Sequence, residues 1–359
     1  MWLVLLAVPV SFPFILVGGY YAYHKVNFSA VFCAPFGQVD DDLGWSLKPN
    51  AESCYGMHDP ERAGSLAFNS TIFTDENGFR AAAPGGPTAV GGYMAVGDSW
   101  TFGYGVDFGA SYPGHLERLT GVPVVVAASP GYGSAQAIGL AERWVKRLQP
   151  RALIYLDFGF WERSACRGQS RPRLILKPCY WVDPSTKRIE IVRPPDGLVS
   201  RAYRWGVAPG GMLGAGEDGW GYFLISRPVM RFFGYLVQLG VFPGMAHDFR
   251  AVGVELEEIK RGTVRHLNAV ARTAKVPLIV LDPFDDYTAL SEEFAQGGVR
   301  VTVIGSEIWK REVEEPAARL GGSLYRVPYD GHFGSGMNEL TARLIARELE
   351  KVGSTLRAQ

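Results

Sequence analysis

The sequence lacks any excess of charge, because 36 basic and 36 acidic side chains leave a formal net charge of zero over 359 residues. A general nucleic-acid-binding surface requires a basic excess, so this balance argues against nucleic acid as a partner. The sequence also lacks a CxxC pair, a HExxH motif, a phosphate loop and an EF-hand pattern. We therefore expect no metal site and no cofactor.

Charged side chains are also missing from residues 1–23, and His24 and Lys25 follow directly. About 20 apolar residues span a bilayer, so this segment is long enough for a transmembrane helix. A cleaved signal peptide normally has a basic n-region and a shorter apolar core; a buried soluble helix is a third interpretation. The length and the missing basic residues favour a retained N-terminal membrane anchor.

Cysteine is scarce, with single residues at Cys33, Cys54, Cys166 and Cys179. An even number after an export-type segment is compatible with disulfide bonds in an oxidising compartment. Proximity in the sequence favours the pairs 33–54 and 166–179. Four cysteines allow three pairings, however, and four unrelated buried thiols are the alternative.

Five short apolar runs, rich in Val and Ile, alternate with segments of helical periodicity. Such continuous runs are typical of parallel strands that are covered on both faces. The runs are residues 93–97, 122–128, 152–158, 276–282 and 299–304, and the helical segments are 110–120, 134–148, 252–274 and 338–351. The alternation predicts an α/β fold, a three-layer sandwich with a central parallel five-stranded sheet.

The chain divides by composition into three parts. Residues 1–23 are the anchor or signal, and the turn-rich residues 26–90 form a lead-in that we expect to wrap the main domain. Residues 91–359 form that domain, interrupted at 165–250 by an insertion rich in Gly, Pro and aromatic residues. We expect this insertion beside the carboxyl ends of the strands, where ligand sites of α/β folds lie; a peripheral packing role is the alternative.

Ser99 follows the first apolar run in the stretch VGDSWTFGYGV. A turn from a strand into a helix would expose its hydroxyl at the carboxyl edge of the sheet, beside backbone N–H groups. A serine hydroxyl is a weak nucleophile unless a base takes its proton. By itself, Gly-Asp-Ser is better explained as the start of a capped helix.

Two further stretches could complete a site around this serine. Asp330 and His332 precede the last helix, and an imidazole with a carboxylate beside it can act as a general base. Gly131 follows the second run, and its backbone N–H could stabilise an oxyanion. Taken singly, His332 could be a surface histidine and Gly131 an ordinary turn.

The combination resembles the SGNH/GDSL hydrolase superfamily. The stretches LGWSLKPN, TDENGFR, GDSWTFGYGV and PGYGSAQ, in that order, resemble bacterial envelope-associated members, over roughly residues 40–160 and 276–350. The resemblance implies an SGNH/flavodoxin-like fold with Ser99 as nucleophile, His332 as base, Asp330 as acid and Gly131 as oxyanion donor.

The third block departs from the family pattern, because Trp161 stands where an oxyanion-binding Asn is expected and Glu162 where Asp is expected. A tryptophan offers one N–H donor and no acceptor. A missing oxyanion donor typically costs about 10²–10³ in rate. Three interpretations follow: an enzyme using the backbone amides with or without Trp161, an enzyme for an unusual substrate, or an inactive protein. The Asp-x-His spacing is also one residue shorter than the commonest form.

The resemblance implies a membrane-tethered, extracytoplasmic (periplasmic) serine esterase or deacylase that hydrolyses O-acyl bonds of a small molecule or an envelope polysaccharide. A polysaccharide O-acyltransferase using the same triad is one alternative. The other is an inactive glycan-binding protein, in which aromatic side chains stack on sugars. The candidate aromatic residues are Trp161, Tyr180, Trp181, Trp205 and Trp220.

Overall fold

Five parallel strands form the centre of the computed structural model, which describes residues 30–62, 64–156, 158–159, 163–166, 177–183, 185–186, 188–200 and 252–357. These strands are β7 (Tyr93–Gly97), β8 (Val124–Ala128), β9 (Ala152–Leu156), β12 (Leu278–Leu281) and β13 (Val301–Ile304). Their spatial order is β8-β7-β9-β12-β13, and all neighbouring pairs are parallel. This is the 2-1-3-4-5 order of flavodoxin-like folds.

The complete sheet is larger than the five strands expected, because its described part has nine. The lead-in adds four antiparallel strands: β1 (Ala30–Phe32), β4 (Glu52–His58), β5 (Leu66–Thr74) and β6 (Arg80–Ala81). The prediction of a five-stranded sheet was therefore wrong for the sheet as a whole. Antiparallel strands can leave one face in water and carry polar residues such as Glu52 and Asn69, so they form no continuous apolar run.

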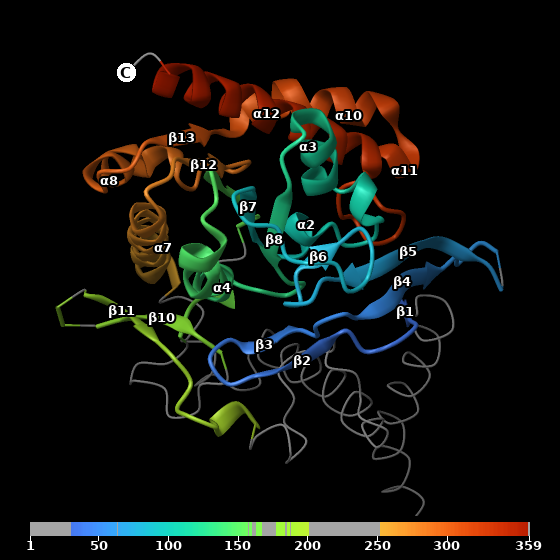
Figure 1. Ribbon diagram of the computed structural model, residues 1–359, viewed down its shortest axis with the longest axis horizontal. Helices are drawn as coiled ribbons and strands as arrows, with labels where there is room; N and C mark the ends of the chain where they lie inside the picture. The colour runs from blue at the N-terminus through green and yellow to red at the C-terminus, as the bar shows by residue number, and fades with distance from the viewer. Residues whose placement is uncertain are drawn as a thin grey trace, which may run out of the picture.

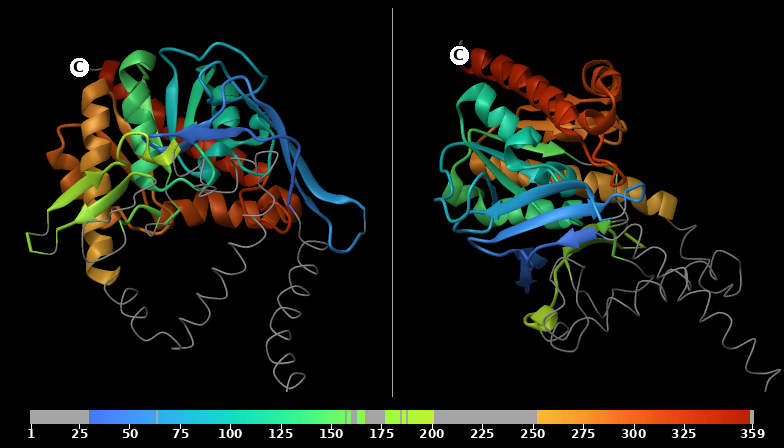
Figure 2. Two further views of the ribbon diagram at one scale, coloured as in Figure 1. Left: turned by 90° about the horizontal axis from the view of Figure 1, so that it is seen from below. Right: turned by 90° about the vertical axis from the view of Figure 1, so that its right-hand side faces the viewer.

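The lead-in therefore extends the sheet. The β4–β5 hairpin projects from one edge of the domain (Figures 1 and 2). The single pair Arg80–Val126 joins the antiparallel strands to β8. A separate two-stranded hairpin consists of β2 (Gly37–Asp40) and β3 (Gly44–Leu47).

Helices cover both faces of the parallel strands (Figure 1). Alternation along β7 sends Met94 and Val96 into the core under α4 (Ser134–Leu148) and α7 (Val252–Ala274), while Ala95 faces the opposite core. That second core lies under α3 (Tyr112–Thr120) and α12 (Ser335–Arg357). The helices expected at 134–148 and 252–274 have those bounds, and those expected at 110–120 and 338–351 are present with shifted ends.

Short helices complete the C-terminal half. They are α8 (Ser291–Gln296), α9 (Ser306–Trp309), α10 (Glu315–Leu320) and α11 (Gly322–Tyr325). The sequence analysis did not predict these helices. α8 and α11 are too short to show a helical period, whereas α9 and α10 are joined by the π-helical residues Lys310–Glu314 into one continuous helix.

The described part of the insertion is a small hairpin of β10 (Cys179–Val182) and β11 (Ile189–Val192), which lies against α7. Disulfide bonds join Cys33 to Cys54 and Cys166 to Cys179, which confirms the pairing that proximity favoured. Residues 201–250 lie outside the described residues. The expectation that the insertion borders the strand ends is therefore not tested there.

Within the described ranges, no helix is both long enough and apolar enough to cross a membrane. The anchor predicted at residues 1–23 lies outside those ranges.

Candidate active site

A tight turn at the end of β7 places Ser99 at the carboxyl edge of the sheet. Ser99 is the first residue of α2 (Ser99–Phe102), and the Asp98 side chain caps this helix by accepting the N–H of Trp100 at 3.0 Å. A Cβ on Gly97 would lie 2.2 Å from Thr101 Oγ1, so the turn admits only glycine. The Asp-Ser sequence therefore caps a helix and also presents the serine hydroxyl.

His332 reaches this hydroxyl from the loop between α11 and α12. Its Nε2 lies 2.8 Å from Ser99 Oγ, and its Nδ1 is hydrogen-bonded to Asp330 Oδ1. The same carboxylate oxygen accepts the backbone N–H of His332 at 3.3 Å. The short Asp-x-His spacing is thus sufficient, because Gly331 between them turns the chain with a φ of 87°. The structure brings together the serine, the imidazole and the carboxylate.

Asp330 is held as a carboxylate by its neighbours. Burial raises its pKa, but the hydrogen bond and charge of His332 and the hydrogen bond of Tyr55 outweigh burial and leave this pKa below its usual value. An ionised Asp330 can fix the imidazole tautomer that has its proton on Nδ1 and leaves Nε2 free to accept the serine proton.

Tyr55 was missed in the sequence analysis. It lies on β4 in the lead-in, and its hydroxyl donates to Asp330 Oδ2 at 2.6 Å. No motif marks this residue, and 275 positions separate it from Asp330. Only the addition of β4 to the sheet brings the two together, and that pairing had not been predicted.

Gly131 lies at the same edge of the sheet as Ser99. The parallel register pairs Gly97 of β7 with Ala128 of β8, so Ser99 and Gly131 follow neighbouring strand ends. Gly131 has a φ of 80°, a conformation that L-residues rarely adopt. The predicted oxyanion residue is thus in a backbone conformation that requires glycine.

The third strand, β9, contributes the loop that contains Trp161 and Glu162, and both lie outside the described residues. The role of Trp161 stays a prediction. Beside them, Arg163 forms an ion pair with Asp98 at 3.6 Å. The loop after β9 thus contacts the turn that holds Ser99.

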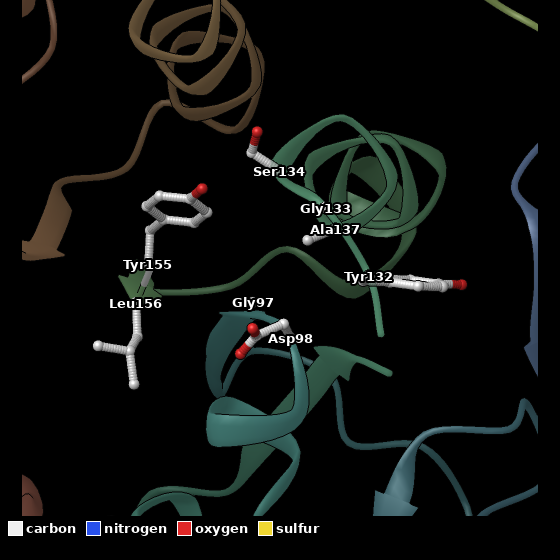
Figure 3. Close-up of a pocket in the computed structure, with 8 residues that line it drawn as sticks. All are labelled: Gly97, Asp98, Tyr132, Gly133, Ser134, Ala137, Tyr155 and Leu156. Carbon is white, nitrogen blue, oxygen red and sulfur yellow. The ribbon is translucent and has the colours of Figure 1, made fainter. Parts of the chain in front are cut away.

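A small pocket lies behind this turn, at the ends of β7 and β9 and the start of α4 (Figure 3). Asp98 and Tyr155 border it, together with Ser134, whose hydroxyl donates to Ser164 and also contacts Thr263. The remaining lining residues are Gly97, Tyr132, Gly133, Ala137 and Leu156. The pocket therefore lies between the Asp98 side of this turn and the start of α4.

An aromatic ridge runs from the imidazole to the surface and consists of Trp100, Phe158 and Phe284. The Trp100 ring lies 4.6 Å from His332 and stacks on Phe158 at 4.0 Å, and Phe158 meets Phe284 at 5.3 Å. The Phe284 side chain is 56% exposed. The ridge gives the site an apolar wall that is open to solvent at one end.

The aromatic residues that we expected to stack on sugars are placed differently. Tyr180 is buried, with its hydroxyl 3.3 Å from His266 Nδ1, so its ring cannot stack on a ligand. Trp181 packs against the Cys166–Cys179 disulfide. Trp205 and Trp220 lie outside the described residues. Among the residues described, no cluster of three His, Cys, Asp or Glu side chains could hold a metal ion.

No family model matches this sequence, and no curated protein matches it. Among solved structures, an acetyl xylan esterase, Est2A, from the rumen bacterium Butyrivibrio proteoclasticus matches with a TM-score of 0.36 and 11% identity, over 74% of this chain and 66% of that chain. A carbohydrate esterase with divergent catalytic and non-catalytic binding functions matches with a TM-score of 0.38 and 8% identity, over 90% of this chain and 98% of its own. Likeness at this level does not identify a substrate.

Proposed function

We propose that this protein is an SGNH-type serine esterase or deacylase that hydrolyses carboxylic ester bonds. The observation that carries the proposal is the hydrogen-bonded chain from Ser99 Oγ to His332 Nε2, at 2.8 Å, and from His332 Nδ1 to Asp330. A nucleophile, a base and a group that orients the base are the three parts that acyl transfer through serine requires.

The reaction follows from this chain. His332 Nε2 takes the Ser99 proton as Oγ bonds to the ester carbonyl carbon, and Asp330 stabilises the imidazolium. The tetrahedral intermediate collapses, the C–O bond to the leaving alcohol breaks, and His332 returns the proton to that alcohol. Water then attacks the acyl-serine, with His332 again taking and returning the proton, and releases the acid.

Backbone amides are the proposed oxyanion donors. The first N–H groups of a helix have no intrahelical partner, so the Ser99 amide at the start of α2 suits this role. The Gly131 amide follows the neighbouring strand end. Trp161 could add an indole N–H from the third block, in place of the family's asparagine.

The proposed substrates are O-acyl groups on envelope glycans, and the proposed location is extracytoplasmic, with a membrane anchor at residues 1–23. The sequence resemblance supports the substrate class, and the uncharged N-terminal stretch supports the anchor. Disulfide bonds persist in oxidising compartments, so the Cys33–Cys54 and Cys166–Cys179 bonds support the location.

Labelling with a fluorophosphonate, together with hydrolysis of p-nitrophenyl acetate and an acetylated glycan, tests the proposal. We expect the parent protein to be labelled and active, and Ser99→Ala to lose both properties while remaining folded. Ser65→Ala is the control, because Ser65 bonds only locally, to the Arg62 carbonyl oxygen. Hydrolysis that persists in Ser99→Ala contradicts the proposal, and a folded parent protein with neither property favours a glycan-binding role.

A further inference from the structure

We propose that Tyr55 is a positioning residue of the triad and that the lead-in strand β4 is therefore part of the catalytic machinery. This inference rests on the proposed function, because it assigns a role in the same site. It goes beyond that function by giving residues 30–81 a part in the reaction in addition to their part in the sheet.

The two oxygens of the Asp330 carboxylate have separate partners. Oδ1 accepts from the His332 side chain and backbone, while Oδ2 accepts from Tyr55 at 2.6 Å. Two anchors on one carboxyl group fix the plane in which the group lies. With Oδ1 alone held, the carboxyl group would keep its contact with His332 but could turn about its own bond. Tyr55 thus restricts the orientation of Asp330 and, through it, that of the imidazole.

Tyr55 is itself held rigidly. Its side chain is 3% exposed, and its ring stacks on Tyr104 with centroids 3.9 Å apart. Tyr104 in turn meets the edge of the His332 ring at 5.3 Å. On β4, Tyr55 pairs with Ser70 of β5, and the preceding residue, Cys54, is joined to Cys33. A donor in so fixed a place can hold a carboxylate better than a mobile side chain can.

Tyr55 also changes the charge that His332 experiences. Burial, Tyr104 and Asp330 all raise the pKa of Tyr55, so its hydroxyl stays a proton donor at neutral pH. This hydrogen bond draws negative charge from Asp330 and weakens its stabilisation of the imidazolium. Loss of the hydroxyl alone would therefore strengthen that stabilisation, and the acidic limb of the activity profile would move to higher pH.

Other side chains among the described residues also face the imidazole. Ser99 and Trp100 face it from α2 and Tyr104 from the loop that follows. The nearest cation on its own loop is Arg326, which lies 5.4 Å above the Trp100 ring. All of these groups stay in place when Tyr55 loses only its hydroxyl, so a change in pH dependence would report the Tyr55–Asp330 bond.

The test compares Tyr55→Phe with Tyr180→Phe. Both tyrosines are buried, both follow a disulfide-bonded cysteine, and Phe preserves the ring packing of each. Tyr180 bonds to His266 instead of the triad, which makes it a matched control. The measurements are kcat, KM and the pH profile of kcat on p-nitrophenyl acetate, together with the melting temperature.

In Tyr55→Phe we expect kcat to fall about tenfold and KM to change less than about twofold. The acidic limb of the pH profile of kcat should move to higher pH by about 0.5–1 unit. Tyr180→Phe should keep the parent kcat and profile. If both variants lose stability while kcat and the acidic limb of Tyr55→Phe stay at parent values, the inference is overturned. Failure of the proposed function itself would appear separately, as hydrolysis that survives Ser99→Ala.

Discussion

Ser99 Oγ and His332 Nε2 lie 2.8 Å apart although 233 residues separate them in the sequence. Their contact depends on two loops at one edge of the sheet, the turn after β7 and the loop before α12. Because each loop is fixed by glycines and by packing, the contact is a property of the folded domain.

The first prediction concerns the base. His332→Ala should lower kcat for ester hydrolysis by about 10⁴- to 10⁶-fold, because it removes the imidazole that would take the Ser99 proton. Circular dichroism should show an unchanged fold. His115→Ala is the control, since His115 lies on α3 and contacts Arg118. Parent-level hydrolysis by His332→Ala would exclude the proposed triad.

The second prediction concerns Gly131. Its φ of 80° makes Gly131→Ala costly by about 1–3 kcal/mol, although the new methyl group would meet only the Trp45 ring at an ordinary 3.6 Å. We also expect kcat to fall by about 10²-fold, because a strained backbone would move the N–H away from the oxyanion.

A second glycine separates these two effects. Gly121 ends α3 with a φ of 67°, and a Cβ there would meet no atom within 4 Å. Gly121→Ala should therefore carry a comparable conformational cost with no loss of kcat. Equal kcat values for the two variants would remove Gly131 from the site.

The third prediction concerns Glu142, on α4, and the pH dependence that its carboxylate gives to the stability of the folded protein. The hydrogen bond from His266 lowers its pKa from 4.5 to about 2, and Arg193 acts in the same direction. A lowered pKa means that the ionised group stabilises the folded state above pH 4.5. That contribution is lost as the pH falls toward the folded-state pKa.

Glu142→Gln should therefore be less stable than the parent protein at neutral pH, with a difference in melting temperature that narrows below about pH 4.5. Glu292→Gln removes an exposed carboxylate from α8 and is the control, for which we expect no such change. A difference that stays constant down to about pH 2 would contradict the His266–Glu142 coupling.

The fourth prediction concerns the exposed end of the aromatic ridge. Phe284→Ala should raise KM about three- to tenfold for esters with a ring next to the acyl group, because it removes a stacking partner. Its melting temperature should change little, since the ring is 56% exposed. Val90→Ala, at another exposed apolar position, should leave KM unchanged. If KM is the same in both variants, the ridge does not contact substrate.

Most of the parallel sheet could be predicted from the sequence, because a strand buried on both faces must be apolar throughout. The runs YMAVG and VVVAA have this form, and they became β7 and β8. The strand β5, LAFNSTIFT, lies between β4 and β6, carries exposed polar residues and follows a turn-rich stretch, so its pattern did not distinguish it from a loop. The antiparallel half of the sheet could therefore be identified only from the structure.

For a related reason, only part of the candidate site could be predicted from the sequence. Ser99, Asp330 and His332 lie in glycine-rich loops, where a polar residue is conspicuous and its chemistry suggests a role. Tyr55 lies inside a strand, where a tyrosine is ordinary, and its role depends on a hydroxyl that meets Asp330 across the fold. Local spacing contains no information about such a contact.

The contact between Tyr55 and Asp330 also has a consequence for the order of events during synthesis. The site joins residues from position 55 to position 332, so loops of more than 200 residues must close before the candidate site is complete. Contacts so distant in sequence form late and slowly. A nascent chain that already displays Ser99 therefore has neither the imidazole nor the carboxylate beside it until the loop before α12 is in place.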